Sequence, residues 1–364
     1  MEMITRIATV ALIGVGSGMV SLPETVAAET VTYGNFEVTF YGNGEVFSSA
    51  YYDSTSSVKD WTNEMKDSVG RALNYWSDVI TTDSAEKVKV AFVWEDLGSG
   101  TLGGATDVWY WDPFTGRTLS GAEATLRDSG NKSSFHNISS GETTAFVSLA
   151  SNANFYYGES TTAIKSNQYD FQSVLVHEIG HIMGFNTFCR ETGWTIAVGV
   201  TYRSQSESFL CVTELDTLLV AENGTGDLVS VFESSNSSVV PGYVNYQQVV
   251  EFSPGTEYYL KTGEGENGEL ELSTLKVYNP AHYSSGSSMS HVESRSPGSD
   301  EEPQMSYAIA NGKIRRELSS EELSLLRAMG WTVSIPEPSA FGLFSGLLAV
   351  AWSSARRYRR EIKF

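Results

Sequence analysis

The segment 170–183 constrains the fold of this chain more than any other, because nearly every side of it is apolar. Its spacing predicts a helix that begins after Asp170, whose side chain is suited to the N-cap position. A helix without a broad polar face has to be covered on all sides, so the rest of the chain must fold around it. The apolar residues are Phe171, Val174, Leu175, Ile179, Ile182 and Met183.

Two histidines interrupt this apolar helix, and they stand four residues apart in His177-Glu178-Ile179-Gly180-His181. That spacing puts both imidazoles on one face, one turn apart, where they can reach the same metal ion. We expect Zn²⁺, because imidazole nitrogen is one of its usual ligands. The simpler alternative is a pair of core histidines with no metal.

Glu178 follows the first histidine and could lie beside the metal without binding it. There it could take a proton from metal-activated water and pass it to a leaving amine. Zinc lowers the pKa of its bound water to about 7, so the pattern predicts a hydrolytic centre. A catalytic zinc usually has three protein ligands and one open position, which requires a third ligand outside this segment.

Gly184, three residues after His181, completes the HExxHxxG pattern typical of the metzincin clan of zinc metallopeptidases. The place of the usual next ligand is taken by Thr187, a poor ligand for zinc. Between about residues 61 and 332 the chain instead resembles the leishmanolysin-like metzincins, in which a long insertion precedes the third histidine. Three segments carry the resemblance: the third-ligand segment 286–293 (GSSMSHVE), the methionine turn Pro303-Gln304-Met305, and the closing helix 318–331.

This resemblance implies an α+β fold, with a twisted mixed sheet, an active-site helix and a largely β insertion. It also implies an exported zinc endopeptidase that acts on protein or peptide substrates, with His177, His181 and His291 as metal ligands and Glu178 as general base. Metzincins align peptides antiparallel to the edge strand above the active-site helix, and we expect 144–153 to be that strand. The sequence pattern alone equally allows a strand inside the sheet.

Other ligand sets remain open. His282 also lies downstream but lacks the flanking match, and a thermolysin-like site would use Glu207 or Glu214. His136 lies in a loop rich in Ser and Asn, where a surface position is expected. Tyr307 follows Met305 by two residues, which resembles the astacin and serralysin turn, and it could stabilise the oxyanion. The alternative for this tyrosine is a packed aromatic ring.

The rest of the chain divides into recognisable elements. Alternation and periodicity predict a hairpin at 31–46, an amphipathic helix at 61–80, strands at 88–94 and 144–157, a glycine-rich loop at 98–104, and a capping box at 319–322. We expect a signal peptide at 1–28, an N-terminal catalytic subdomain at 29–189, the β insertion at 190–281, a C-terminal subdomain at 282–333, and a sorting segment at 334–364.

Both ends of the chain indicate export. Residues 1–28 have the three-part layout of a secretory signal. The C-terminus has a Pro336-Glu337-Pro338 triplet, a short apolar run and an arginine cluster, and it resembles the PEP-CTERM sorting signal of Gram-negative bacteria. That resemblance implies an exosortase-type partner, transient membrane association through this segment, and a location at the cell surface or in the extracellular matrix.

Two further features bound the function. The net charge of −20 argues against a nucleic-acid partner, because phosphate binding depends on clustered Lys and Arg. Cys189 and Cys211 could form a disulfide in an exported protein, or could remain two buried thiols. The competing function is a surface-associated adhesive or structural protein that keeps a zinc site without turning over substrate.

Overall fold

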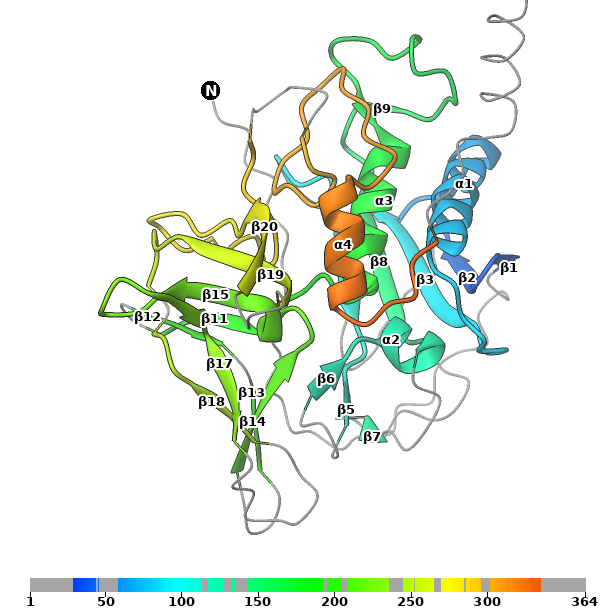
Figure 1. Cartoon of the computed structure of the whole chain (residues 1–364). Helices are drawn as coiled ribbons and strands as arrows, with labels where there is room; N and C mark the ends of the chain where they lie inside the picture. The colour runs from blue at the N-terminus through cyan, green and yellow to red at the C-terminus, as the bar shows by residue number, and fades with distance from the viewer. Residues whose placement is uncertain are drawn as a thin grey trace, which may run out of the picture.

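The structure is a computed structural model (Figure 1), which describes residues 29–43, 45, 58–112, 117–127, 133–134, 143–192, 195–198, 200–203, 208–235, 245–251, 253–264, 270–284, 286–295 and 302–334. The signal peptide, nearly all of the sorting segment, His136 and Glu207 lie outside these residues, as do the side chains of Cys189 and Cys211. Among the described helices, none has the length and apolar character needed to cross a membrane.

A five-stranded sheet forms the centre of the N-terminal half. Its order is β1 (Glu29–Tyr33), β2 (Phe36–Tyr41), β3 (Val88–Glu95), β8 (Ala145–Ala150) and β4 (Gly103–Asp107). The pairs β2/β3 and β3/β8 are parallel, whereas β1/β2 and β4/β8 are antiparallel. The predicted α+β class with a mixed sheet is therefore confirmed.

Two helices pack together beside this sheet, namely α1 (Asn63–Val79) and α3 (Phe171–Ile182). Figure 1 shows α3 running in front of β3 and β8. Trp76 of α1 is buried against α3 and donates its indole N–H to the carbonyl of Val176 at 3.0 Å. The predicted N-cap is confirmed, because Asp170 accepts a hydrogen bond from the backbone N–H of Ser173 at 2.9 Å.

Helix α3 ends in a turn that only glycine fits. Gly184 has φ +94°, in the left-handed region that favours glycine. A Cβ atom at this position would also lie 2.8 Å from the side-chain carboxyl carbon of Glu123. That glutamate belongs to α2 (Gly121–Leu126), where it forms a capping box with Ser120. The glycine therefore lets the chain turn out of α3 against α2.

Smaller elements flank this core. They are β5 (Tyr110–Trp111), β6 (Arg117–Leu119), β7 (Ser133–Ser134), β9 (Phe155–Tyr156) and β10 (Tyr169–Asp170). Strand β6 pairs in parallel with β14 (Ser208–Thr213) of the following region, and this pairing joins the two parts of the molecule.

The region predicted to be a β insertion contains short strands and one 3-10 helix, η1 (Asp216–Leu218), and no α-helix among its described residues. Helix α4 (Ser320–Ala328) packs against β19 and β20 of this region. The strands are β11 (Cys189–Thr192), β12 (Thr195–Val198), β13 (Val200–Arg203), β14 (Ser208–Thr213), β15 (Leu219–Glu222), β16 (Leu228–Ser230), β17 (Phe232–Ser235), β18 (Asn245–Gln248), β19 (Tyr258–Glu264) and β20 (Leu270–Lys276).

Most of the predicted elements are confirmed, but three are corrected. The strand predicted at 144–157 is shorter, because β8 ends at Ala150 and a turn separates it from β9. The hairpin, the two long helices and the capping box of Ser319 and Glu322 are present. The loop predicted at 98–104 is wrong at its end, because Gly103 and Gly104 begin β4. The predicted edge strand 144–153 is also wrong: β8 has a partner on each side, and β4 is the edge of this sheet.

Candidate metal centre

Two histidines of α3, His177 and His181, converge with His291 from a distant part of the chain. The Nε2 atoms of His177 and His291 are 3.1 Å apart, and each lies 3.2 Å from Nε2 of His181. His181 and His291 are both 1 % exposed, whereas His177 is partly exposed. The three therefore form a mostly buried group that could hold one metal ion and that remains accessible on one side.

The hydrogen bonds of the rings fix where their protons lie. Nδ1 of His177 lies 2.8 Å from the carbonyl oxygen of Gln304, and Nδ1 of His181 lies 2.8 Å from that of Phe185. Nδ1 of His291 lies 2.9 Å from the carbonyl oxygen of Ser287. A carbonyl oxygen can only accept, so each Nδ1 carries the single proton of a neutral ring. All three Nε2 atoms then turn a bare lone pair toward the same point.

This arrangement fits a metal ion. Three lone pairs at this distance repel one another unless a cation lies among them. Nitrogen ligands of a tetrahedral zinc, at about 2.0–2.1 Å from the metal, are about 3.3–3.4 Å apart. The observed separations of 3.1–3.2 Å are close to that value. Carbonyl partners on Nδ1 are also the usual outer support of histidine ligands, because they orient the ring.

The electrostatics keep the rings neutral, as ligands must be. Burial lowers the pKa of His181 to about 4. Burial, followed by the charge of His181, lowers the pKa of His177 and of His291 well below the ordinary range. At neutral pH a cation therefore does not have to displace protons from these nitrogens.

The turn before His291 and the methionine turn position the third histidine. Met289 is buried and has φ +71°, which makes it the one residue other than glycine with positive φ among the described residues. Such a backbone costs about 1–3 kcal/mol and persists only where the surroundings enforce it. Met305 packs under α3, where a Cβ on Gly180 would lie 2.5 Å from its sulfur. The backbone N–H of Val292 donates to the carbonyl of Met305 at 3.0 Å.

Glu178 lies next to the first histidine and under the edge strand. It is 1 % exposed, and its Oε2 atom has no hydrogen-bond partner among the described residues. A Cβ on Gly103 would lie 2.8 Å from Oε1, so this glycine of β4 makes room for the carboxylate. Burial raises the pKa of Glu178 to about 8. A cation at the histidines would lower this pKa again, because positive charge favours the carboxylate.

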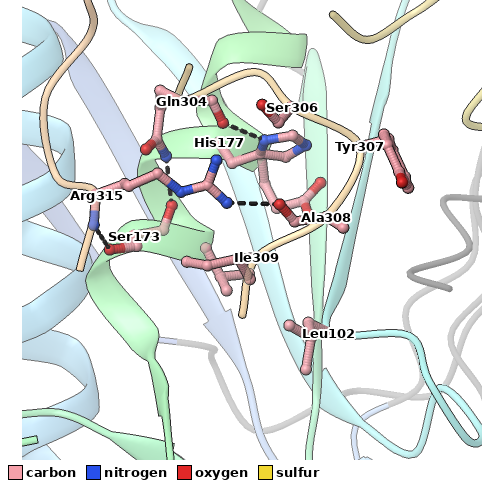
Figure 2. Close-up of a pocket in the computed structure, with 11 residues that line it drawn as sticks. Leu102, Ser173, His177, Gln304, Ser306, Tyr307, Ala308, Ile309 and Arg315 are labelled. Carbon is pink, nitrogen blue, oxygen red and sulfur yellow. Dashed lines mark hydrogen bonds between the residues drawn. The ribbon is translucent and has the colours of Figure 1, made fainter. Parts of the chain in front are cut away.

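A pocket opens beside His177 and Glu178, with about 300 Å³ of empty space when the solvent at its mouth is included. Figure 2 shows its walls, which come from α3, from residues on both sides of Met305 and from the residue before β4. Besides those two residues, it is lined by Leu102, Ser173, Val174, Gln304, Ser306, Tyr307, Ala308, Ile309 and Arg315.

The remaining predicted residues lie in different surroundings. Tyr307 lines the pocket and stacks on Tyr278, with ring centroids 3.9 Å apart at 15°; its role at the oxyanion stays a prediction. His282 is exposed and does not belong to the histidine group. Glu214 is buried, but it pairs with Arg117 and with Arg127.

Sequence reasoning missed two residues of this site. The sequence around Gly103 shows only that it belongs to a glycine-rich stretch. Arg315 lies at the pocket because of the tertiary fold, which no local sequence pattern predicts. Comparisons with protein-family models, with curated proteins and with solved structures gave no match.

Proposed function

We propose that this chain is a zinc-dependent endopeptidase with a metzincin-type catalytic domain. One observation carries the proposal: three bare histidine nitrogens converge beside the buried carboxylate of Glu178, whose Oε2 atom has no hydrogen-bond partner among the described residues. A purely structural zinc is usually enclosed by four protein ligands, whereas three histidines leave a fourth position open. The partial exposure of His177 and the adjoining pocket are consistent with a position that substrate can reach.

The proposed residue roles follow from protonation and burial. Zn²⁺, when bound by His177, His181 and His291, would supply Lewis acidity to a substrate carbonyl and acidify a water molecule. Glu178 would accept the proton of the attacking water and deliver it to the leaving amine. Burial raises the pKa of this carboxyl group, whereas a bound cation lowers it, so the cation favours the carboxylate that accepts the proton and burial favours the acid that delivers it. Gly103 keeps space above that carboxylate.

Strand β4 offers the edge along which an extended peptide would bind. Ala150 donates to the carbonyl of Leu102, and Val108 donates to the carbonyl of Thr144. Because pairing directions alternate along an antiparallel strand, Gly104 and Thr106 also face β8. The N–H and C=O groups of Gly103, Ala105 and Asp107 therefore face the open edge. Such groups grip a peptide through its backbone, which gives only loose sequence preference.

Proline at position 105 tests this edge. Ala105→Pro removes one outward N–H without touching the bonds from β4 to β8, so we expect KM for peptides to rise about tenfold while zinc stays bound. Ala105→Ser, which keeps the N–H, serves as the matched control. A folded Ala105→Pro protein with unchanged KM would place the binding edge elsewhere.

Casein cleavage by the purified, zinc-loaded protein tests the function itself. We expect cleavage that stops when a chelator removes the metal and returns when Zn²⁺ is restored. A folded, zinc-loaded protein that leaves casein and unfolded peptides intact would contradict the endopeptidase. That result would instead support the surface-associated adhesive or structural protein.

The proposal also covers the export and the location of the protein. The signal-like residues 1–28 and the PEP-CTERM-like end support export and sorting by an exosortase-type enzyme at a Gram-negative cell surface. A protein or peptide outside the cell would then be the substrate.

A further inference from the structure

The pocket beside the candidate metal centre is lined by apolar and polar residues and by one arginine, Arg315. Arg315 is 8 % exposed and lines it together with apolar residues such as Leu102 and Val174. Its guanidinium donates to the carbonyl oxygens of Pro303 and Ala308, both at 2.6 Å. Figure 2 shows this side chain reaching across the pocket toward Ala308.

No carboxylate of the described residues neutralises this arginine by direct contact, because none lies within 4.0 Å of its guanidinium nitrogens. Glu302 and Glu322 are the acidic groups whose charges act on it from a greater distance. Arginine keeps its proton even when buried. The pocket therefore holds a fixed and largely buried cation, and its direct partners among the described residues are neutral carbonyls.

The position of the pocket indicates which side chain of a bound peptide would enter it. Leu102 lines the pocket and immediately precedes β4. A peptide antiparallel to β4 runs toward the beginning of that strand, so the part after its cleaved bond lies next to Leu102. Glu178, which would protonate the new amine, lines the same pocket. The side chain that enters the pocket is then the one that follows the cleaved bond.

We propose that this pocket selects an acidic side chain, aspartate or glutamate, immediately after the cleaved peptide bond, and that Arg315 is the specificity-determining residue. The inference rests on the proposed peptidase function and adds a substrate class to it. A carboxylate beside a desolvated guanidinium gains charge-assisted hydrogen bonds, which are roughly twice as strong as neutral ones. A lysine side chain there would bring a second positive charge beside the buried Arg315, which is unfavourable.

Matched peptides test the selection. Peptides that differ only in the residue after the cleaved bond, namely Asp, Asn, Leu or Lys, are compared by kcat/KM, with the cleaved bond identified by mass spectrometry. For the unmodified protein we expect Asp to exceed its uncharged near-isostere Asn by at least about tenfold, with Lys slowest. Arg315→Gln should bring the Asp/Asn ratio close to one while the Leu peptide is still cleaved.

Control variants separate charge from structure. Arg315→Lys keeps a positive charge and should keep part of the Asp preference. Arg295→Gln makes the same change at an exposed arginine that pairs with Glu321, and it should leave the preference intact. If Arg315→Gln does not fold, the selectivity of the unmodified protein and of Arg315→Lys decides the question.

The outcomes distinguish the two proposals. Cleavage of no peptide at all would contradict the proposed function. Cleavage with Leu or Lys preferred over Asp, or an Asp preference that survives in folded Arg315→Gln, would overturn the role of Arg315 and leave the peptidase standing.

Discussion

Replacement of Glu178 by alanine should lower kcat for peptide hydrolysis by about 10²–10⁴-fold while the protein keeps its zinc. The side chain contacts no described histidine through a hydrogen bond, so its loss leaves the three ring nitrogens in place. What disappears is the group that moves a proton between the attacking water and the leaving amine. Turnover on a fluorogenic peptide and metal content by atomic emission measure the two effects separately.

Melting temperatures of Glu178 variants distinguish a loss of catalysis from a loss of folding. Oε2 of Glu178 is buried without a partner among the described residues, and such a group costs about 1–3 kcal/mol of folding free energy. Glu178→Gln removes the charge at nearly the same volume, so its melting temperature should be equal to or higher than that of the unmodified protein, although turnover is lost. Glu159→Ala, at an exposed acid, is the matched control. Activity within a few-fold of normal in Glu178→Ala would sink the assignment.

Loss of His291 should abolish tight metal binding, with affinity for zinc lowered by at least about 100-fold. This ring supplies one of the three convergent nitrogens, and its Nδ1 is held by the carbonyl of Ser287. His291→Ala leaves two ligands from one helical turn, which cannot surround an ion. Competition with a chromogenic chelator measures the affinity.

His282→Ala is the control for this experiment, since that histidine is exposed and outside the group. It should bind zinc as tightly as the unmodified protein does. The opposite pattern, with zinc lost only in His282→Ala, would reverse the choice of third ligand.

Local chemistry explains why parts of the fold were predictable. Helix α3 combines an N-cap aspartate with apolar residues on nearly every side, and α4 begins with a capping box at Ser319. Both signals act within a few residues. His291 could be chosen over His282 only from the neighbours that resemble a third-ligand segment, because the path that brings it to α3 depends on long-range packing.

The sheet edge shows where local reasoning failed. Strand β4 begins with Gly103 and Gly104, which have little tendency to form strands, so the sequence pattern predicts a loop at these two positions. Strand β8 is buried at all six positions, a pattern typical of a strand covered on both faces and paired on both sides. Arg315 and Gly103 contribute to the site only through tertiary contacts, for which a single sequence has no signal.

The long segment between the second and third histidines affects how much its length can change without disturbing the histidine group. His291 follows His181 by 110 residues, and the strands β11–β20 lie between them. The entropy lost when a chain segment is closed into a loop grows with the logarithm of its length, so doubling the segment costs only about 0.6 kcal/mol. Insertions in the surface loops of this segment, away from the turn that holds His291, therefore add little to the entropy cost of bringing the three rings together. A metal ion held by the three histidines would also join these remote points, so that its dissociation and the opening of this long loop would be linked.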